Sequence, residues 1–193
     1  MIKRRFFKIF ALVLSISLII TLFSGCAEKP DRVLLISIDG LRADAIENTE
    51  YGRKLLENSA YSLSVTTVYP SITLPCHMSM FHSVTPDKHG VSTNTYTPSE
   101  SLGEGICEAL LAAGKSSSIF YNWREIGDIA TEGSTKTSCY IPGETDGWEE
   151  TNKRLGDAAI EYLKASPTDF LFLYLGFLDE TGHRYGWLSE EYY

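Results

Sequence analysis

Two near-continuous apolar runs indicate that the chain is an α/β protein. Residues 33–38 (VLLISI) and 170–175 (FLFLYL) have the pattern of strands that are buried on both faces of a parallel sheet. Residues 116–121 predict a shorter strand, and the β-branched, roughly alternating stretch 61–69 predicts another. The pattern therefore predicts a mostly parallel sheet.

Helical periodicity fills the intervals between these strands. Residues 43–59 predict a surface helix, and Pro75 can occupy the first turn of a helix that runs through His82. Residues 102–114 and 149–164 repeat apolar side chains at helical spacing. Alternation of strands and helices predicts an α/β sheet with helices on both faces. Such sheets bind ligands beyond the carboxyl ends of their strands.

The first 25 residues have the pattern of an export signal. Basic side chains between Lys3 and Lys8 precede the apolar run 9–23, and Ser24-Gly25-Cys26 resembles a bacterial lipoprotein cleavage site. We expect cleavage after residue 25, a lipid on Cys26 that anchors the protein to the outer face of the bacterial cell membrane, and a linker over 26–31. An uncleaved anchor helix is the alternative, because the run approaches the roughly 20 residues that span a bilayer. Loss of fatty-acid labelling in Cys26→Ala would distinguish the two.

The remaining residues, 32–193, are expected to form one acidic domain. The chain has 17 basic and 25 acidic residues, and four basic residues but no acidic ones lie in the first 25, which leaves 13 against 25, a net charge of −12. This charge argues against nonspecific binding to nucleic acid. A hydrophobic content of 44% excludes a fully disordered chain.

The cysteines of this domain are too few and too widely spaced for a disulfide framework or a Cys-x-x-Cys zinc site. They are Cys76, Cys107 and Cys139. Either Cys107 pairs with Cys139, or these cysteines are buried as small hydrophobic residues.

Polar side chains stand where two of the predicted strands end. Asp39 follows the first strand, and Asp179 and His183 follow the last, four residues apart. A carboxylate and an imidazole at that spacing can converge on one metal ion. Glu180 is adjacent, but its side chain is expected to point away from the side shared by Asp179 and His183. The alternatives are a helix cap at Asp39 and an ordinary polar loop at 179–183.

A hydroxyl and two aromatic side chains complete the candidate site. Thr73 lies just before the helix start that Pro75 marks, where unpaired N–H groups and the helix dipole favour an anion. Its hydroxyl can cap the helix, or it can act as a nucleophile whose proton a metal ion helps to remove. Tyr121 and Trp123 follow a predicted strand and can stack on a substrate, with packing at the rim as the alternative.

Three motifs occur together along the chain. They are LISIDGLR at 35–42, PSITLPCH at 70–77 followed by PDKHGV at 86–91, and DETGHRYG at 179–186. In this order they resemble the type I phosphodiesterase/nucleotide pyrophosphatase family of the alkaline phosphatase superfamily. The resemblance covers the chain from about residue 33 to its end, and it implies an alkaline-phosphatase-like fold.

The resemblance implies a two-zinc site. Asp39 and the Thr73 oxygen would bind one ion, and Asp179 and His183 would bind the other. Thr73 would attack the phosphorus of a small phosphodiester, pyrophosphate or phosphomonoester, and hydrolysis of the phosphothreonine would follow. Cys76 stands where relatives that cleave nucleotides usually have an asparagine that binds a phosphoryl oxygen. A thiol is a weaker donor, so the substrate stays open.

The family also implies ligands that this chain does not contain. Relatives complete the metal site with an Asp-His pair and a further histidine downstream of the Asp179/His183 motif, and this sequence stops at Tyr193. We therefore expect an incomplete N-terminal part of the domain, with the activity of the 193-residue chain alone left open. His77 and His89 are expected to be structural.

Two other functions remain open. One is phosphoryl transfer to a polymer of the cell envelope, for which a threonine nucleophile serves equally well. The other is a non-catalytic cell-surface lipoprotein that binds a solute or a partner. Sulfate-ester hydrolysis is disfavoured, because the segment that begins at Cys76 lacks the proline and arginine of the Cys-x-Pro-x-Arg motif.

Overall fold

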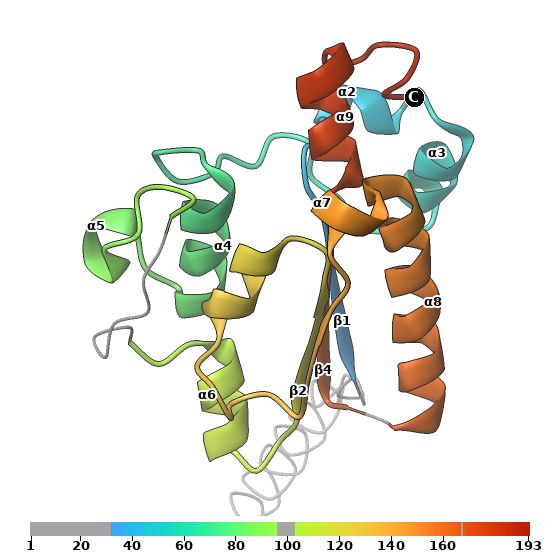
Figure 1. Cartoon of the computed structure of the whole chain (residues 1–193). Coiled ribbons are helices and arrows are strands. Elements are labelled where there is room, and N and C mark those ends of the chain that lie inside the picture. The colour runs from blue at the N-terminus through green and yellow to red at the C-terminus, as the bar shows by residue number, and fades with distance from the viewer. Residues whose placement is uncertain (1–31, 96–102, 167) are drawn as a thin grey trace, which may run out of the picture. The chain divides into compact units, whose positions relative to one another are not determined.

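The computed structural model describes residues 32–95, 103–166 and 168–193 (Figure 1). Its strands are β1 (Val33–Ile38), β2 (Ser117–Tyr121), β3 (Thr137–Tyr140) and β4 (Phe170–Leu175). Its helices are α2 (Ala43–Ile46), α3 (Glu50–Glu57), α4 (Thr73–His82), α5 (Pro86–His89), α6 (Ile106–Ala112), the 3₁₀ helix η1 (Arg124–Ile129), α7 (Gly143–Asp146), α8 (Trp148–Ala165) and α9 (Phe177–Tyr185). The predicted signal peptide, Cys26 and the linker lie outside the described residues.

The four strands form one parallel sheet in the order β1-β4-β2-β3. The strands at 33–38 and 170–175 begin and end where the sequence predicts, and β2 begins one residue later than predicted. Parallel neighbours need crossover connections, and helices supply them. The predicted α/β class is therefore confirmed.

The core lies on both faces of the central strands, because successive side chains of a strand point to opposite faces. The α4, α6 and η1 face receives Phe170, Phe172 and Tyr174 of β4, and the α8 face receives Leu171 and Leu173. Figure 1 shows α4 and α6 on one side of the sheet and α8 on the other. No helix among the described residues is long and apolar enough to cross a membrane.

The first strand differs from the prediction in its burial. β1 is an edge strand of the described sheet, and its Val33, Leu34, Ile36 and Ile38 side chains are between 42% and 49% exposed. An apolar run predicts the strand, but it does not establish which other elements cover it.

The predicted strand at 61–69 is wrong. The backbone there forms no strand, and most of its residues are exposed. Alternating β-branched residues predict a strand only when a neighbouring strand supplies hydrogen bonds, since β-propensity depends strongly on context. In the described structure, β4 covers one edge of β1, and this stretch does not pair with the other.

Several helix boundaries also differ from the predictions. The single helix predicted over 43–59 is two, α2 and α3, and the side chain of Thr49 caps the second by accepting a hydrogen bond from the Gly52 N–H. The helix predicted over 102–114 begins at Ile106, where Glu108 accepts a hydrogen bond from the Gly105 N–H. The short elements α5, η1, β3 and α7 are not predicted by the sequence pattern.

Cys107 and Cys139 are free thiols, so the suggested pairing is not formed. Cys107 is buried in the core beside α4 and α6, whereas Cys139 packs into the core beside α8. The sheet separates the two thiols. Burial raises the pKa of the Cys107 thiol to about 11, which keeps it protonated and unreactive near neutral pH.

Asp169 ties the start of β4 to the start of β2. Its carboxylate accepts hydrogen bonds from the Ser116 N–H at 2.8 Å and the Ser116 hydroxyl at 2.9 Å, and Lys115 Nζ lies 3.2 Å away. The Ser116 N–H, the Ser116 hydroxyl and Lys115 together lower the pKa of Asp169 to about 2. These interactions stabilise the folded protein fully above the unfolded-state pKa of about 3.9. The stabilisation is lost as the pH falls through the folded-state pKa.

We expect Asp169→Asn to remove part of the acid-induced loss of stability between about pH 4 and pH 2. Urea unfolding at several pH values measures this, with Asp157→Asn on the exposed face of α8 as the matched control. Equal pH dependence in wild-type protein and Asp169→Asn would contradict the assignment.

Candidate functional site

A cavity of about 230 Å³ lies at the carboxyl ends of β1 and β4. All four side chains that the sequence suggested as metal ligands line it: Asp39, Thr73, Asp179 and His183. They come from the end of β1, the start of α4 and helix α9. The structure therefore brings together residues that are up to 144 positions apart in the sequence.

Asp39 is held by two hydrogen bonds before any ligand binds. The hydroxyl of Tyr174 donates to Oδ2 at 2.7 Å, and the Gly40 N–H donates to Oδ1 at 3.1 Å. Each carboxylate oxygen keeps lone-pair capacity for a further partner. Burial, and then the charge of Asp39, raises the pKa of Tyr174 far above its usual range, so that this phenol stays protonated and donates.

Gly40 allows β1 to approach α9. Its φ of +74° is in the left-handed region that favours glycine. A Cβ atom at this position would lie 2.6 Å from the Asp179 Cα and 2.9 Å from the Asp179 N. The Asp-Gly sequence that ends β1 is therefore required for Asp39 and Asp179 to reach the same cavity.

Asp179 and His183 lie one turn apart on α9. Asp179 Oδ2 is 3.6 Å from His183 Nε2, and the side chains are 28% and 70% exposed. Burial, and next the charge of Asp39, raises the pKa of the Asp179 carboxyl. Two carboxylates that repel each other in a cavity are an arrangement that a bound cation stabilises.

Thr73 is the first residue of α4, and Ile72 is the N-cap. The half-buried Thr73 side chain faces the cavity beside the positive end of a ten-residue helix. Thr73 therefore does not cap the helix, and its hydroxyl lies where an anionic group is favoured.

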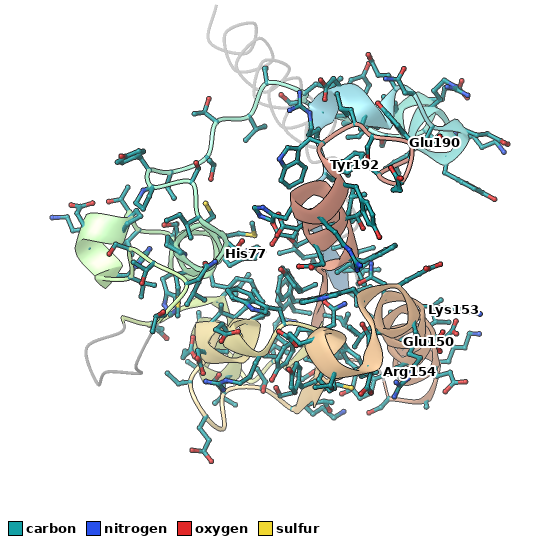
Figure 2. The ribbon with its side chains drawn as sticks, turned by 45° about the horizontal axis from the view of Figure 1, so that its top comes forward. His77, Glu150, Lys153, Arg154, Glu190 and Tyr192 are labelled. Atoms are coloured by element: carbon teal, nitrogen blue, oxygen red, sulfur yellow. The ribbon has the colours of Figure 1, made fainter. Side chains whose placement is uncertain are left out.

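His77, labelled in Figure 2, links α4 to β1. Burial lowers the pKa of His77, so the ring is neutral. Nδ1 lies 2.7 Å from the Thr73 carbonyl, which only accepts, so Nδ1 carries the proton and Nε2 accepts from the Ser37 hydroxyl at 2.9 Å. These bonds fix the start of α4 against the strand that carries Asp39, which is the structural role that the sequence suggested.

His89 is also structural. The Val91 N–H donates to its Nδ1 at 3.1 Å, so Nε2 carries the proton that faces the Ser79 hydroxyl at 2.9 Å. Both ring nitrogens therefore have partners within the protein.

Asn94 lines the cavity, and sequence reasoning missed it. Its Oδ1 accepts a hydrogen bond from the Leu74 N–H at 3.0 Å, which fixes the amide beside the first turn of α4. The orientation leaves the Nδ2 donor as the group that can serve a ligand. Asn94 lies three residues beyond the PDKHGV motif, in a polar stretch without periodicity that would single it out.

Three aromatic side chains form much of the cavity wall, namely Trp123, Trp148 and Tyr174. Trp123 lies where the sequence suggested. The indole of Trp148 is wedged between two glycines, since Cβ atoms at Gly143 and Gly176 would approach it to 2.4 Å and 2.8 Å. A rigidly held indole at this position can stack on a substrate.

Two of the suggested substrate-binding residues do not line the cavity. Cys76 is not among the residues that line it, and its sulfur accepts a hydrogen bond from the Thr67 hydroxyl at 3.1 Å. Tyr121 is 8% exposed in the core and stacks on Tyr140, because alternation along β2 turns its ring toward η1. Glu180, by contrast, lines the cavity, although its side chain was expected to point away from Asp179 and His183. It is exposed, and its long side chain reaches the cavity wall.

Tyr192 fastens the loop that follows Asp39 (Figure 2). This residue is 5% exposed, and its hydroxyl donates to the Gly40 carbonyl at 2.7 Å and accepts from the Arg42 N–H at 3.0 Å. Its ring packs edge-on against Trp187, which in turn packs against His183. The segment after α9 therefore contacts both the loop that follows Asp39 and the helix that carries Asp179 and His183.

The donor atoms in the cavity are of the types that zinc takes, namely carboxylate and hydroxyl oxygens and an imidazole nitrogen. If Asp39 with Thr73 and Asp179 with His183 each held one ion, as the resemblance implies, each ion would have two protein donors, one fewer than the three of a typical catalytic zinc. Within residues 32–95, 103–166 and 168–193, no three His, Cys, Asp or Glu side chains are grouped closely enough to hold one ion.

The chain matches a known protein family and two venom enzymes. Residues 33–193 match the family model described as type I phosphodiesterase/nucleotide pyrophosphatase. Venom phosphodiesterase 2 of Crotalus adamanteus is 26% identical over 190 residues, which cover 87% of this chain and 23% of the venom protein. Venom phosphodiesterase 1 of the same snake matches equally well over 22% of its length.

Solved structures show the same fold. Murine ectonucleotide pyrophosphatase/phosphodiesterase 5 superimposes with a TM-score of 0.64 at 24% identity, over 82% of this chain and 46% of that one. An inactive variant of the mouse protein in complex with AMP gives a TM-score of 0.66 at 23% identity, over 84% and 47%. This chain thus spans less than a quarter of the venom enzymes and under half of the mouse chain. On the family-model match, it belongs to the type I phosphodiesterase/nucleotide pyrophosphatase family.

Proposed function

We propose that the protein hydrolyses small phosphate esters in a metal-dependent reaction that uses Thr73 as the nucleophile. The observation that carries this proposal is the convergence of Asp39, Thr73, Asp179 and His183 in one cavity at the strand ends. A structural role does not require a hydroxyl, two mutually repelling carboxylates and an imidazole in the same cavity. Family membership supports the same reaction class.

The residues around Thr73 suit attack on phosphorus. The Thr73 oxygen forms the new bond, and the bond from phosphorus to the leaving oxygen breaks. The amino-terminal end of α4 favours the charge on the phosphoryl oxygens, and the Asn94 amide, fixed by the Leu74 N–H, can donate to one of them. Water then hydrolyses the phosphothreonine, and the free hydroxyl returns.

Asp39 with the Thr73 oxygen would hold one cation, and Asp179 with His183 would hold a second. Bound there, divalent ions would lower the pKa of the Thr73 hydroxyl and neutralise charge on the phosphoryl group. The chain's own contribution is to orient the ligands: Tyr174 and the Gly40 N–H hold the Asp39 carboxylate, and His77 holds the start of α4.

Nucleotides and other phosphodiesters are the substrate class that the relatives suggest. The venom proteins are phosphodiesterases by name, and the mouse protein is an ectonucleotide pyrophosphatase/phosphodiesterase that was solved with AMP. Trp123 and Trp148 supply aromatic surfaces for the organic part of such a substrate.

The metal requirement is tested with bis-p-nitrophenyl phosphate. We expect the rate to fall to background after dialysis against a chelator and to return with added zinc, and Asp39→Asn is expected to raise the zinc concentration for half-maximal rate by about 10- to 100-fold. Asp44→Asn, on the exposed surface after the same strand, is the control. Turnover that survives the chelator, or equal zinc dependence in both variants, would contradict the proposal.

Transfer to an envelope polymer differs only in the acceptor. Release of all phosphoryl product into water supports hydrolysis, whereas its recovery on added lipid or glycan would favour the transferase.

A further inference from the structure

A second, larger cavity adjoins the first. It has a volume of about 1150 Å³ and lies between α7, α8 and α9, and we call it the α8–α9 groove. The groove and the site cavity share two lining residues, Trp148 and Glu180. A molecule bound in the site cavity therefore meets the groove at these two side chains.

The groove lies on the side of the site away from Thr73. Thr73 belongs to α4, which packs on one face of the sheet, whereas Trp148 begins α8, which packs on the other (Figure 1). In a displacement at phosphorus, the attacking and leaving oxygens lie roughly in line. For a phosphorus bound between Thr73 and Trp148, a leaving oxygen in line with the Thr73 oxygen would point toward Trp148, Glu180 and the groove beyond them.

The charge of the groove is mostly negative. Its lining includes the carboxylates Glu144, Glu149, Glu150, Glu180 and Glu191, against the two cations Lys153 and Arg184. Figure 2 shows Glu150 and Lys153 together on α8. Such a surface repels a multiply charged anion such as pyrophosphate, whereas it tolerates an uncharged alcohol and attracts a cationic one. The indole of Trp148 offers an aromatic face for an ammonium group.

We propose that the α8–α9 groove binds the leaving group, and that its charge selects phosphodiesters of uncharged or cationic alcohols over nucleoside triphosphates. This inference rests on the proposed function and names the substrate class of the same site. In the step concerned, the Thr73 oxygen–phosphorus bond forms, and the phosphorus–oxygen bond to the alcohol breaks. The Thr73 hydroxyl gives up its proton to water, and the electron pair of the broken bond stays on the alcohol oxygen, which takes up a proton from water.

Two substrates that share the transferred group test the proposal. ATP releases pyrophosphate, and the 2-aminoethyl ester of AMP releases a cationic alcohol, while both leave the adenosine 5′-phosphoryl group on Thr73. AMP is therefore the measured product in both reactions. Because the two leaving groups differ in intrinsic reactivity, the informative quantity is the change in the ratio of their kcat/KM values on substitution.

Reciprocal charge changes on α8 supply the variants. We expect Glu150→Lys to raise kcat/KM for ATP relative to the aminoethyl ester by about three- to tenfold, and Lys153→Glu to lower it by a similar factor. Glu161→Lys, on the same helix but outside the groove, makes the same change in net charge and is expected to leave the ratio within about twofold.

Binding keeps the proposal testable without turnover. Binding of the same two compounds is measured in the Thr73→Ala protein in metal-free buffer. There, Glu150→Lys is expected to tighten the binding of ATP relative to the aminoethyl ester, and Lys153→Glu is expected to weaken it. Turnover with an unchanged ratio of the two kcat/KM values in both α8 variants would overturn the proposed role of the groove and leave the proposed function intact. Charge-dependent binding without turnover of any ester in the wild-type protein would support the groove and contradict the proposed function, whereas no turnover and no binding shift would overturn both.

Discussion

Gly40→Ala is expected to unfold much of the protein or to abolish cation binding in the fraction that stays folded. The substitution places a side chain at a φ of +74°, and the new Cβ atom would lie 2.6 Å from the backbone of Asp179 and 2.9 Å from the ring of Trp187. The left-handed conformation and the overlap together are expected to cost about 3 kcal/mol or more. Urea unfolding measures the stability, and zinc titration by calorimetry measures the site.

Gly90→Ala is the matched control. Gly90 has a similar φ of +77°, but no atom lies within 4 Å of a Cβ atom placed there. It therefore carries the backbone cost of roughly 1 kcal/mol without the collision. If the two variants lose the same stability and bind zinc equally well, the close approach of β1 to α9 does not have the importance that we assign to it.

Thr73→Ala is expected to lower kcat/KM for phosphodiester hydrolysis by about 10³-fold or more, because the variant lacks the atom that we propose attacks phosphorus. Thr73 is not the N-cap of α4, so its removal is not expected to cost the stability of a lost cap. Circular dichroism and urea unfolding check that the fold persists. Substrate affinity is expected to change far less than the rate.

Thr73→Ser separates chemistry from packing. It keeps the hydroxyl and removes a methyl group, so we expect it to retain activity within about tenfold of the wild-type protein. A Thr73→Ala protein that turns over substrate as fast as Thr73→Ser would contradict the assignment of Thr73 as the nucleophile.

The predicted site residues that lie in the cavity share one property: their position follows from local sequence. Asp39 ends an apolar run, Thr73 begins a helix marked by Pro75, and Asp179 and His183 are one helical turn apart after another apolar run. Parallel strands bring the ends that Asp39 and Asp179 follow to one edge of the sheet, so the convergence of these two could be predicted. Thr73 enters with α4, after a stretch that forms no strand.

The residues that sequence reasoning missed depend on contacts over long sequence distances. Asn94 enters the cavity because the Leu74 N–H, 20 residues earlier, fixes its amide. Tyr174 repeats the apolar alternation of β4 and gives no sign that its hydroxyl reaches Asp39. Trp148 looks like the first apolar residue of a helix, and only Gly143 and Gly176 show why it is held at the wall.

Two suggested residues, Cys76 and Tyr121, do not line the cavity. The resemblance suggests Cys76 for the site because it stands where relatives usually have an asparagine, but its sulfur accepts a hydrogen bond from the Thr67 hydroxyl. Tyr121 was placed there because it ends a strand, but its side chain points to the core face. A motif position and a place at a strand end do not settle the direction of a side chain, which the pleat and the helical turn determine.

The most direct test of the central claim is to identify the residue that carries the phosphoryl group during turnover. Protein mixed with zinc and bis-p-nitrophenyl phosphate is quenched in acid within the first turnovers, digested and analysed by tandem mass spectrometry. We predict a p-nitrophenyl phosphoryl adduct on Thr73 that is absent from the Thr73→Ala protein. At a zinc concentration that saturates only the wild-type protein, we expect it to be absent from Asp39→Asn as well. Zinc-dependent turnover with the adduct on another residue would contradict the account.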